Sequence, residues 1–291
     1  WNKRAVPLTP GWLRQPLVAA WGRDAVSGME AAHFAGAPLD LTAKGDPDAV
    51  AQAVGGTVLP TGSVRLHNTA QVSALPGYVT GDWWVQDAAA AIPVRTLGDV
   101  SGLQVLDLCA APGGKAMQLA AGGADVTAVD MSERRMARVA ENLTRVGLNA
   151  RTVVSDAFAF DEQGFDAVLL DVPCSATGTI RRHPDLPYAK DGSEFGMLIE
   201  QQTAMIDHAL TLLKPGGRLV FCTCSLLPDE GEVQVEDALV RHPDLRAEPV
   251  DVPGVRRDWQ TEEGGLRLRP DYWPELGGMD GFYVAILRKP A

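Results

Sequence analysis

The sequence predicts an α/β protein in which helices cover a mainly parallel sheet. From about residue 103, short β-rich runs alternate with helical stretches, as parallel strands joined by helices require. Hydrophobic residues make up 46% and charged residues 22% of the 291 positions, which is the composition of a globular protein with a real core. We expect a small N-terminal α/β module over residues 1–78 and a larger domain over residues 79–291.

The first 78 residues carry the signals of short elements broken by Gly and Pro. An amphipathic stretch over residues 10–21 predicts a helix, and PLDLT, DPDAVAQAV and SVRLH predict short strands and a helix. The chain begins with Trp1 rather than Met, and we expect a further domain, basic in charge, ahead of it in a longer protein.

The larger domain shows its strands and helices in turn. Strands are predicted over residues 104–109, 125–130, 151–155, 165–171, 218–223 and 282–288. Helices are predicted up to about residue 121, from the N-cap Ser132 to Gly147, over residues 195–213, and after Pro228. The PGG run at 215–217 is expected to separate the long helix from the strand that follows it.

The first strand ends in DLCAAPGGK, which places a glycine-containing turn at the carboxyl edge of the sheet, where small ligands bind. The turn matches neither GxGxxG nor a Walker A loop, so a pyrophosphate is disfavoured. Asp130, at the end of the next strand, is suited to accept hydrogen bonds from ribose hydroxyls. Asp156 ends the third strand and could bind an adenine amino group. A nucleoside cofactor such as S-adenosylmethionine fits; the alternative is a tight turn with aspartates as helix caps.

Two cysteines follow neighbouring strands of the predicted sheet, Cys174 in DVPCSATG and Cys224 in FCTCS. We interpret Cys109 and Cys222 as small buried hydrophobes, and no CxxC spacing indicates a metal site. Methyl transfer to carbon 5 of a pyrimidine needs a thiolate that adds at carbon 6, and a second group can assist its release. Asp171 can hold the N3 and amino edge of a cytosine. These arguments leave open which cysteine is the nucleophile.

These motifs resemble those of the RsmB-like (Fmu/Sun) family of RNA cytosine-5 methyltransferases. The similarity spans about residues 75–288 and is carried by LDLCAAPGGK, AVDMSERR, DVPCSATGTIRRHPD, KPGGRLVFCTCSLLPDEGE and GMDGFYVAIL. It implies a Rossmann-like class I methyltransferase domain with a mainly parallel seven-stranded sheet. The resemblance makes Cys224 the nucleophile and gives Cys174 the release of the product. It assigns cofactor contacts to Cys109, Ala110, Ala111, Pro112, Gly113, Gly114, Lys115, Asp130, Asp156 and Asp171.

One departure from the family lies in the N-terminal module. The family usually carries an LRxN-like strand there, whereas this sequence reads LDLT, with Asp40 and Thr42 in the place of Arg and Asn. We expect this difference to reverse a charge on the substrate side of the module.

The net charge of −11 argues at first against a nucleic-acid partner. The acidic excess, however, falls in residues 81–170 (−5) and 226–291 (−6), while residues 1–80 (+1) and 171–225 (−1) are nearly neutral. Arg181, Arg182 and His183 follow Cys174 and are predicted to contact RNA phosphates, with a solvated loop as the alternative. Trp83 and Trp84 either stack on bases or pack in the core. We expect weak, salt-sensitive RNA binding by this chain alone.

The sequence therefore predicts methyl transfer from S-adenosylmethionine to carbon 5 of a cytosine in RNA, with 16S ribosomal RNA as the first candidate. The alternatives are the same chemistry on transfer RNA or DNA, and a non-catalytic RNA-assembly factor. We expect a cytoplasmic monomer that needs neither a membrane nor a metal ion.

Overall fold

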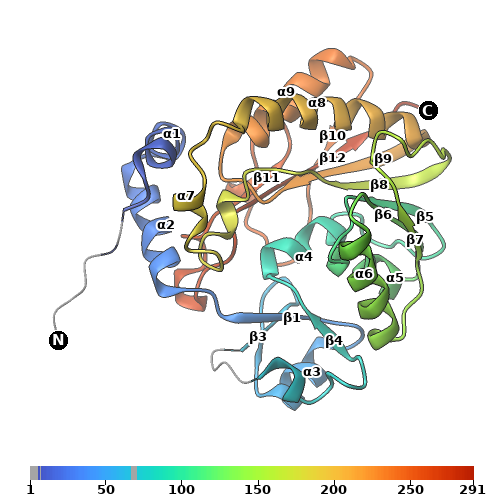
Figure 1. The fold of residues 1–291 in the computed structure, drawn as a ribbon, viewed down its shortest axis with the longest axis horizontal. Coiled ribbons are helices and arrows are strands. Elements are labelled where there is room, and N and C mark those ends of the chain that lie inside the picture. Colours follow the sequence, from blue (N-terminus) through green and yellow to red (C-terminus); the bar gives the residue numbers. More distant parts are fainter. Residues whose placement is uncertain (1–5, 7, 67–70) are drawn as a thin grey trace.

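The computed structural model describes residues 6, 8–66 and 71–291, which form two sheets with helices around them (Figure 1). The smaller sheet is antiparallel, with the strand order β2-β3-β1-β4. Its strands are β1 (Leu39–Ala43), β2 (Thr57–Val58), β3 (Val64–Leu66) and β4 (Trp83–Val85), and helix α3 (Pro47–Val54) packs beside them. An N-terminal α/β module is therefore present. The end of this module at residue 78 stays a prediction. Strand β4, which pairs with β1 in the same sheet, lies after that residue.

Two helices precede this sheet and pack elsewhere. They are α1 (Gly11–Trp21), close to its predicted bounds, and α2 (Arg23–Ala35), which we did not predict. Their buried side chains form one apolar cluster with residues of the larger domain, whose members are Leu13, Leu17, Val26, Met29, Ile180, Leu226 and Leu227. The indole N–H of Trp21 donates to the carbonyl of Leu226 at 2.9 Å. The first two helices therefore belong structurally to the larger domain.

The larger sheet has eight strands, seven of which follow the order β10-β12-β9-β8-β5-β6-β7, with β11 beside β12. Its strands are β5 (Gln104–Leu108), β6 (Asp125–Asp130), β7 (Arg151–Val154), β8 (Phe165–Asp171), β9 (Leu213–Thr223), β10 (Arg246–Glu248), β11 (Leu266–Leu268) and β12 (Phe282–Arg288). The pairs from β7 to β9 are parallel, and every pair with β12 is antiparallel. This mainly parallel α/β sheet confirms the predicted Rossmann-like fold, but it has eight strands rather than the seven expected, because the short β11 pairs with β12 beside the main series.

Helices bury both faces of this sheet (Figure 1). Helices α4 (Ala88–Arg95), α5 (Gly114–Ala121) and α6 (Glu133–Val146) cover one face, and α8 (Phe195–Leu212) and α9 (Glu232–Arg241) cover the other. The short α7 (Leu186–Ala189) lies near α1 and α2. Within β8, Ala167 and Leu169 face the first helix layer, while Val168 and Leu170 face the second. Burial on both faces explains why the parallel strands are almost continuously apolar.

The boundary between α8 and β9 differs from the prediction. Strand β9 begins at Leu213 and contains the PGG run that we expected to separate helix from strand. The register of β9 against β8 shifts there: Phe165 pairs with Leu213, and Ala167 pairs with Arg218. The Pro and Gly residues are therefore accommodated as an irregularity within the strand rather than as a loop before it.

The strand order places a topological switch point between β5 and β8. From β5 the chain continues outward to β6 and β7, then crosses back to β8 and β9 on the other side. In open α/β sheets, ligands bind outside the carboxyl ends of the strands at such a point. The loop after β5 and the residues that end β8 therefore share the crevice in which a site is expected.

Candidate active site

The loop after β5 is held in an unusual backbone conformation. Cys109 has a φ of 68° and Gly113 a φ of 102°, and a Cβ at Gly113 would lie 3.1 Å from a methyl carbon of Val139. Glycine is therefore required at position 113 by both conformation and space. The carboxylate of Asp130 accepts the backbone N–H groups of Ala111 at 3.2 Å and Ser132 at 3.0 Å. Asp130 thus supports the loop from the end of β6.

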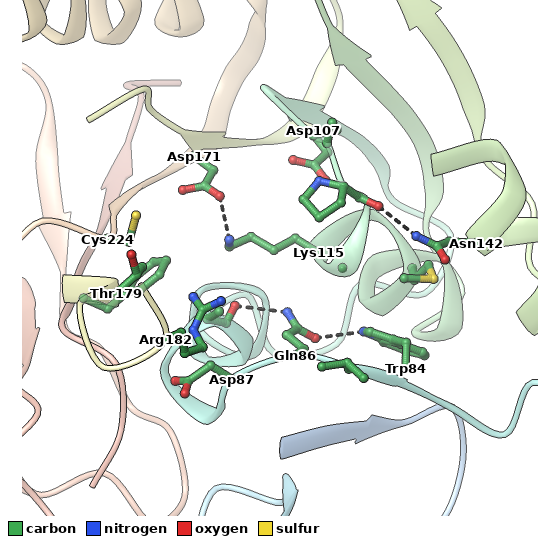
Figure 2. A pocket seen from close by; sticks show the side chains of 18 of the residues that line it. Trp84, Gln86, Asp87, Asp107, Lys115, Asn142, Asp171, Thr179, Arg182 and Cys224 are labelled. Carbon is green, nitrogen blue, oxygen red and sulfur yellow. Dashed lines mark hydrogen bonds and ion pairs between the residues drawn. The ribbon is translucent and has the colours of Figure 1, made fainter. Parts of the chain in front are cut away.

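A cavity of about 430 Å³ opens beside this loop at the switch point (Figure 2). The predicted residues that line it are Ala110, Ala111, Pro112, Gly114, Lys115, Asp171, Arg182 and Cys224. Its volume lies in the range of small-molecule sites. The cavity therefore brings together residues of the glycine loop, of the segment that begins at Asp171 and of the segment that contains Cys224.

Lys115 and Asp171 form an ion pair across the cavity. The ammonium nitrogen lies 2.7 Å from a carboxylate oxygen, and the two side chains approach from α5 and the end of β8 (Figure 2). Burial alone would lower the pKa of Lys115, but the charge and hydrogen bond of Asp171 together with the other acidic groups nearby outweigh burial and raise that pKa. Lys115 therefore stays charged, and Asp171 has a fixed partner in the free protein.

The two predicted thiols lie in contact. The sulfur atoms of Cys174 and Cys224 are 3.4 Å apart, and Cys224 lines the cavity. The hydrogen bond between them lowers the pKa of Cys174 and raises that of Cys224 well above its usual value. The contact therefore favours the thiolate form of Cys174 over that of Cys224. Cys222 is fully buried, as predicted, and burial raises the pKa of its thiol.

Asp107 is a candidate site residue that sequence reasoning missed. It lies within β5, is 0% exposed, lines the cavity, and neither carboxyl oxygen has a hydrogen-bond partner among the described residues. Burial raises its pKa to about 8. The available signal was an acid inside an otherwise apolar strand, since such a carboxyl is rarely buried without a partner.

Other predicted cofactor residues do not line the cavity. Cys109, Gly113 and Asp130 shape or support the loop, and burial raises the pKa of the Cys109 thiol. Asp156 is exposed and accepts the backbone N–H of Phe158 at 2.8 Å. Asp156 therefore caps the turn after β7, which matches the alternative interpretation of that residue.

Arg181 does not fit its predicted role as a phosphate contact. Its side chain is 0% exposed and pairs with Asp87 at 2.5 Å and Asp280 at 2.9 Å, and it also donates to the carbonyl of Gly277. A guanidinium with these partners has no free face for RNA. Arg182, by contrast, is 41% exposed and lines the cavity, and His183 is exposed beside it. Any phosphate contact of this loop falls to Arg182 and His183.

Two further expectations concern residues of the smaller sheet. Trp83 and Trp84 are buried, and their indole N–H groups donate to Pro76 and Gln86, so packing in the core, one of the two interpretations of these residues, is confirmed. The charge reversal expected at Asp40 does not reach a substrate surface. Its carboxylate is buried and pairs with Arg65, its cross-strand neighbour, at 2.6 Å.

A search of the described residues finds neither a helix that could cross a membrane nor a cluster of three or more His, Cys, Asp or Glu residues able to bind a metal ion.

Comparison with known proteins agrees with these motifs. Residues 94–288 match the family described as 16S rRNA methyltransferase RsmB/F. Ribosomal RNA small subunit methyltransferase B of Salmonella arizonae is 42% identical over 236 residues, which cover 78% of this chain and 52% of that protein. The chain thus spans about half the length of the curated relatives it matches.

Solved structures share the fold over almost the whole chain. PH0851 superposes with a TM-score of 0.86 at 25% identity, over 97% of this chain and 66% of that chain. A methyltransferase homolog protein from Pyrococcus horikoshii superposes with a TM-score of 0.75 at 26% identity, over 95% and 94% of the two chains.

Proposed function

This chain belongs to the 16S rRNA methyltransferase RsmB/F family, and from that premise we propose that it transfers a methyl group from S-adenosylmethionine to carbon 5 of a cytosine in 16S ribosomal RNA. One observation carries the proposal. The thiol of Cys224 and the carboxylate of Asp171 line one cavity with the glycine loop, and a second thiol lies 3.4 Å from the first. Addition of a thiolate to a pyrimidine followed by methyl transfer uses all four features together.

The cavity residues fit a nucleoside cofactor with an amino-acid tail. The backbone of Ala110–Pro112 and Gly114 offers a close approach at the start of α5, and the volume is adequate for such a molecule. Asp107 supplies a buried carboxyl with both oxygens free, which suits a polar or cationic group of a ligand. S-adenosylmethionine would supply an electrophilic methyl group there.

The protein's own groups then divide the remaining work. The Cys224 thiol gives its proton to solvent, and its thiolate, held beside Cys174, forms a bond to carbon 6 of the cytosine. This addition makes carbon 5 an enamine carbon and therefore nucleophilic. Asp171 accepts a hydrogen bond from the amino group of the base, beside N3, once it exchanges part of its contact with Lys115. After methylation, the Cys174 thiolate, which the lowered pKa of this group favours, accepts the carbon 5 proton; the double bond reforms, the bond from carbon 6 to sulfur breaks, and the Cys224 thiolate leaves.

A trapping experiment tests the two thiol roles. The wild-type protein and the variants Cys224→Ala and Cys174→Ala are incubated with RNA and S-adenosylmethionine, and denaturing gels are used to detect a covalent protein–RNA band. We expect Cys174→Ala to accumulate the adduct, because release is slowed, and Cys224→Ala to form none. Cys222→Ala is the matched control and should behave as wild type. An adduct with Cys224→Ala but never with Cys174→Ala would reverse the assignment.

A second experiment tests the substrate. The protein is incubated with labelled S-adenosylmethionine and either 16S ribosomal RNA, transfer RNA or DNA, and the modified base is identified by bisulfite sequencing. We expect 5-methylcytosine in the ribosomal RNA alone. Methylation of transfer RNA or DNA would replace the substrate while keeping the chemistry, and RNA binding without any methylated cytosine would favour an assembly factor.

A further inference from the structure

The loops that carry the two thiols are joined by a fully buried polar cluster behind the cavity. It consists of Ser175, Thr177, Gln202, Ser225 and Glu230, each 0% exposed. Ser175 directly follows Cys174, and Ser225 directly follows Cys224. Glu230 comes from the 3-10 turn η3 (Pro228–Glu230), and Gln202 comes from α8. The cluster therefore joins four segments that are separate in the sequence.

Glu230 is the acceptor on which the first thiol loop depends. Its carboxylate accepts the backbone N–H of Ser175 at 2.9 Å and the hydroxyl of Ser175 at 2.5 Å, so one residue is held at two points. Gln202 donates to the same carboxylate at 3.0 Å and to the carbonyl of Pro173 at 2.9 Å. Both chain neighbours of Cys174 are therefore held: Ser175 by Glu230, and Pro173 by Gln202.

The same cluster reaches the second thiol loop. The Ser225 hydroxyl lies 3.1 Å from that of Ser175 and accepts the N–H of Leu227 at 3.0 Å. The backbone N–H of Gly178, in the first loop, donates to the carbonyl of Cys224 at 2.8 Å. Both cysteines are thus held through their immediate neighbours, and the described residues include no cation paired with Glu230, so its charge is balanced by these donors alone.

We propose that Glu230 is a positioning residue that keeps the Cys174 and Cys224 sulfurs in contact by holding the Ser175 and Ser225 segments together. This inference rests on the proposed function for its catalytic consequence, but its geometric part concerns the thiol pair itself. A buried carboxylate without a cation is costly unless each of its contacts is made, so Glu230 fixes the positions of the donors around it. The negative charge of Glu230 raises the pKa of Cys174, so Glu230 acts on this thiol through position and not through its charge.

The test compares Glu230→Gln with Asp229→Asn, a matched change at the adjacent exposed residue of the same turn. The first readout is independent of RNA. Each protein is equilibrated with oxidised and reduced dithiothreitol, and alkylation with mass spectrometry measures the Cys174–Cys224 disulfide. In that exchange the two thiols give up two electrons and two protons to the oxidised reagent, so the equilibrium constant reports how well the sulfurs are held together.

We expect Glu230→Gln to lower this equilibrium constant at least tenfold and Asp229→Asn to leave it within twofold of wild type. The second readout is kcat and KM for methyl transfer, where Glu230→Gln should lower kcat tenfold or more and change KM for the cofactor less than threefold. Ser175→Ala removes one of the hydrogen bonds to Glu230. It should lower the disulfide equilibrium constant and kcat as Glu230→Gln does, but by a smaller factor. Ser175→Ala replaces Glu230→Gln in the test if Glu230→Gln does not fold.

Two results would overturn the proposal: a folded Glu230→Gln with wild-type disulfide equilibrium, or a Ser175→Ala that matches wild type when Glu230→Gln does not fold. Absence of methylation with every nucleic acid, together with the expected loss in the disulfide equilibrium, would instead refute the proposed function and leave the positioning role standing.

Discussion

Arg181 and Arg182 are neighbours in the sequence but occupy opposite environments, and replacing each with methionine measures the difference. Arg181→Met leaves Asp87 buried without its cation and leaves Asp280 with Arg182 alone, because both carboxylates are at most 4% exposed and pair with the Arg181 guanidinium. Breaking a buried ion pair by removing one partner costs about 3–5 kcal/mol. Arg182 is 41% exposed and pairs with Asp280 at 2.6 Å, but Arg181 still neutralises that carboxylate in Arg182→Met, so this change should cost at most about 1 kcal/mol.

The pH dependence of the Arg181 variant follows from the same carboxylates. In the wild-type protein, burial raises the pKa of Asp280 to about 6, although Arg182 and Arg181 oppose this shift. Without Arg181 the pKa of Asp280 should rise further and that of Asp87, which Arg181 holds below its usual value, should also rise, so the folded variant binds more protons than the folded wild type. The difference in free energy of unfolding should therefore be larger at pH 8 than at pH 5.

Urea unfolding followed by tryptophan fluorescence at both pH values provides the assay, and RNA binding at several salt concentrations accompanies it. We expect Arg182→Met to fold normally and to reduce the salt dependence of RNA binding by about one phosphate contact. If Arg181→Met costs less than about 1 kcal/mol, or weakens RNA binding as Arg182→Met does while staying folded, the assignment of Arg181 to the interior is wrong.

Two further predictions concern buried groups at the site. Burial raises the pKa of the Asp107 carboxyl to about 8, so this group should lower the free energy of unfolding by up to about 1.4 kcal/mol per pH unit as the pH rises from about 4 to 8. In unfolding titrations, Asp107→Asn should abolish that slope. The exposed control Asp161→Asn should keep it. A Cβ at Gly178 would lie 2.0 Å from the carbonyl oxygen of Gly281, so Gly178→Ala should lower the free energy of unfolding by about 3 kcal/mol or more. A Cβ at Gly196 would meet no atom within 4 Å, so the control Gly196→Ala should be neutral or stabilising. Equal urea midpoints for the two variants would contradict this packing.

Local patterns predicted the central strands well. The bounds of β6, β8 and β12 agree with prediction to the residue, because each is a short apolar run ended by a turn or a charged residue. The edge strands β10 and β11 have three residues each and could not be separated from loops. Helix α2 was missed because few of its residues are large and apolar, and its packing partners lie about 150–200 residues away.

The candidate site was predictable where strand order alone decides position. Lys115 lies in the helix that follows β5, and Asp171 is the last residue of β8. The two side chains meet because β5 and β8 are adjacent parallel strands whose carboxyl ends lie at the same edge of the sheet. The separate fates of Arg181 and Arg182 were not predictable, since they depend on Asp87 and Asp280, more than 90 residues away in sequence. Asp107 was missed because it lies inside a strand rather than at its end.

The pairing of Arg65 with the C-terminal part of the chain also sets an order for synthesis. Its guanidinium binds Asp40 and also donates to the carbonyls of Leu276 and Gly278, which are 211 and 213 residues later. At about 5–20 residues per second, a ribosome needs roughly 10–40 s to add that length. These two contacts of the N-terminal sheet can therefore form only after residue 278 has been translated.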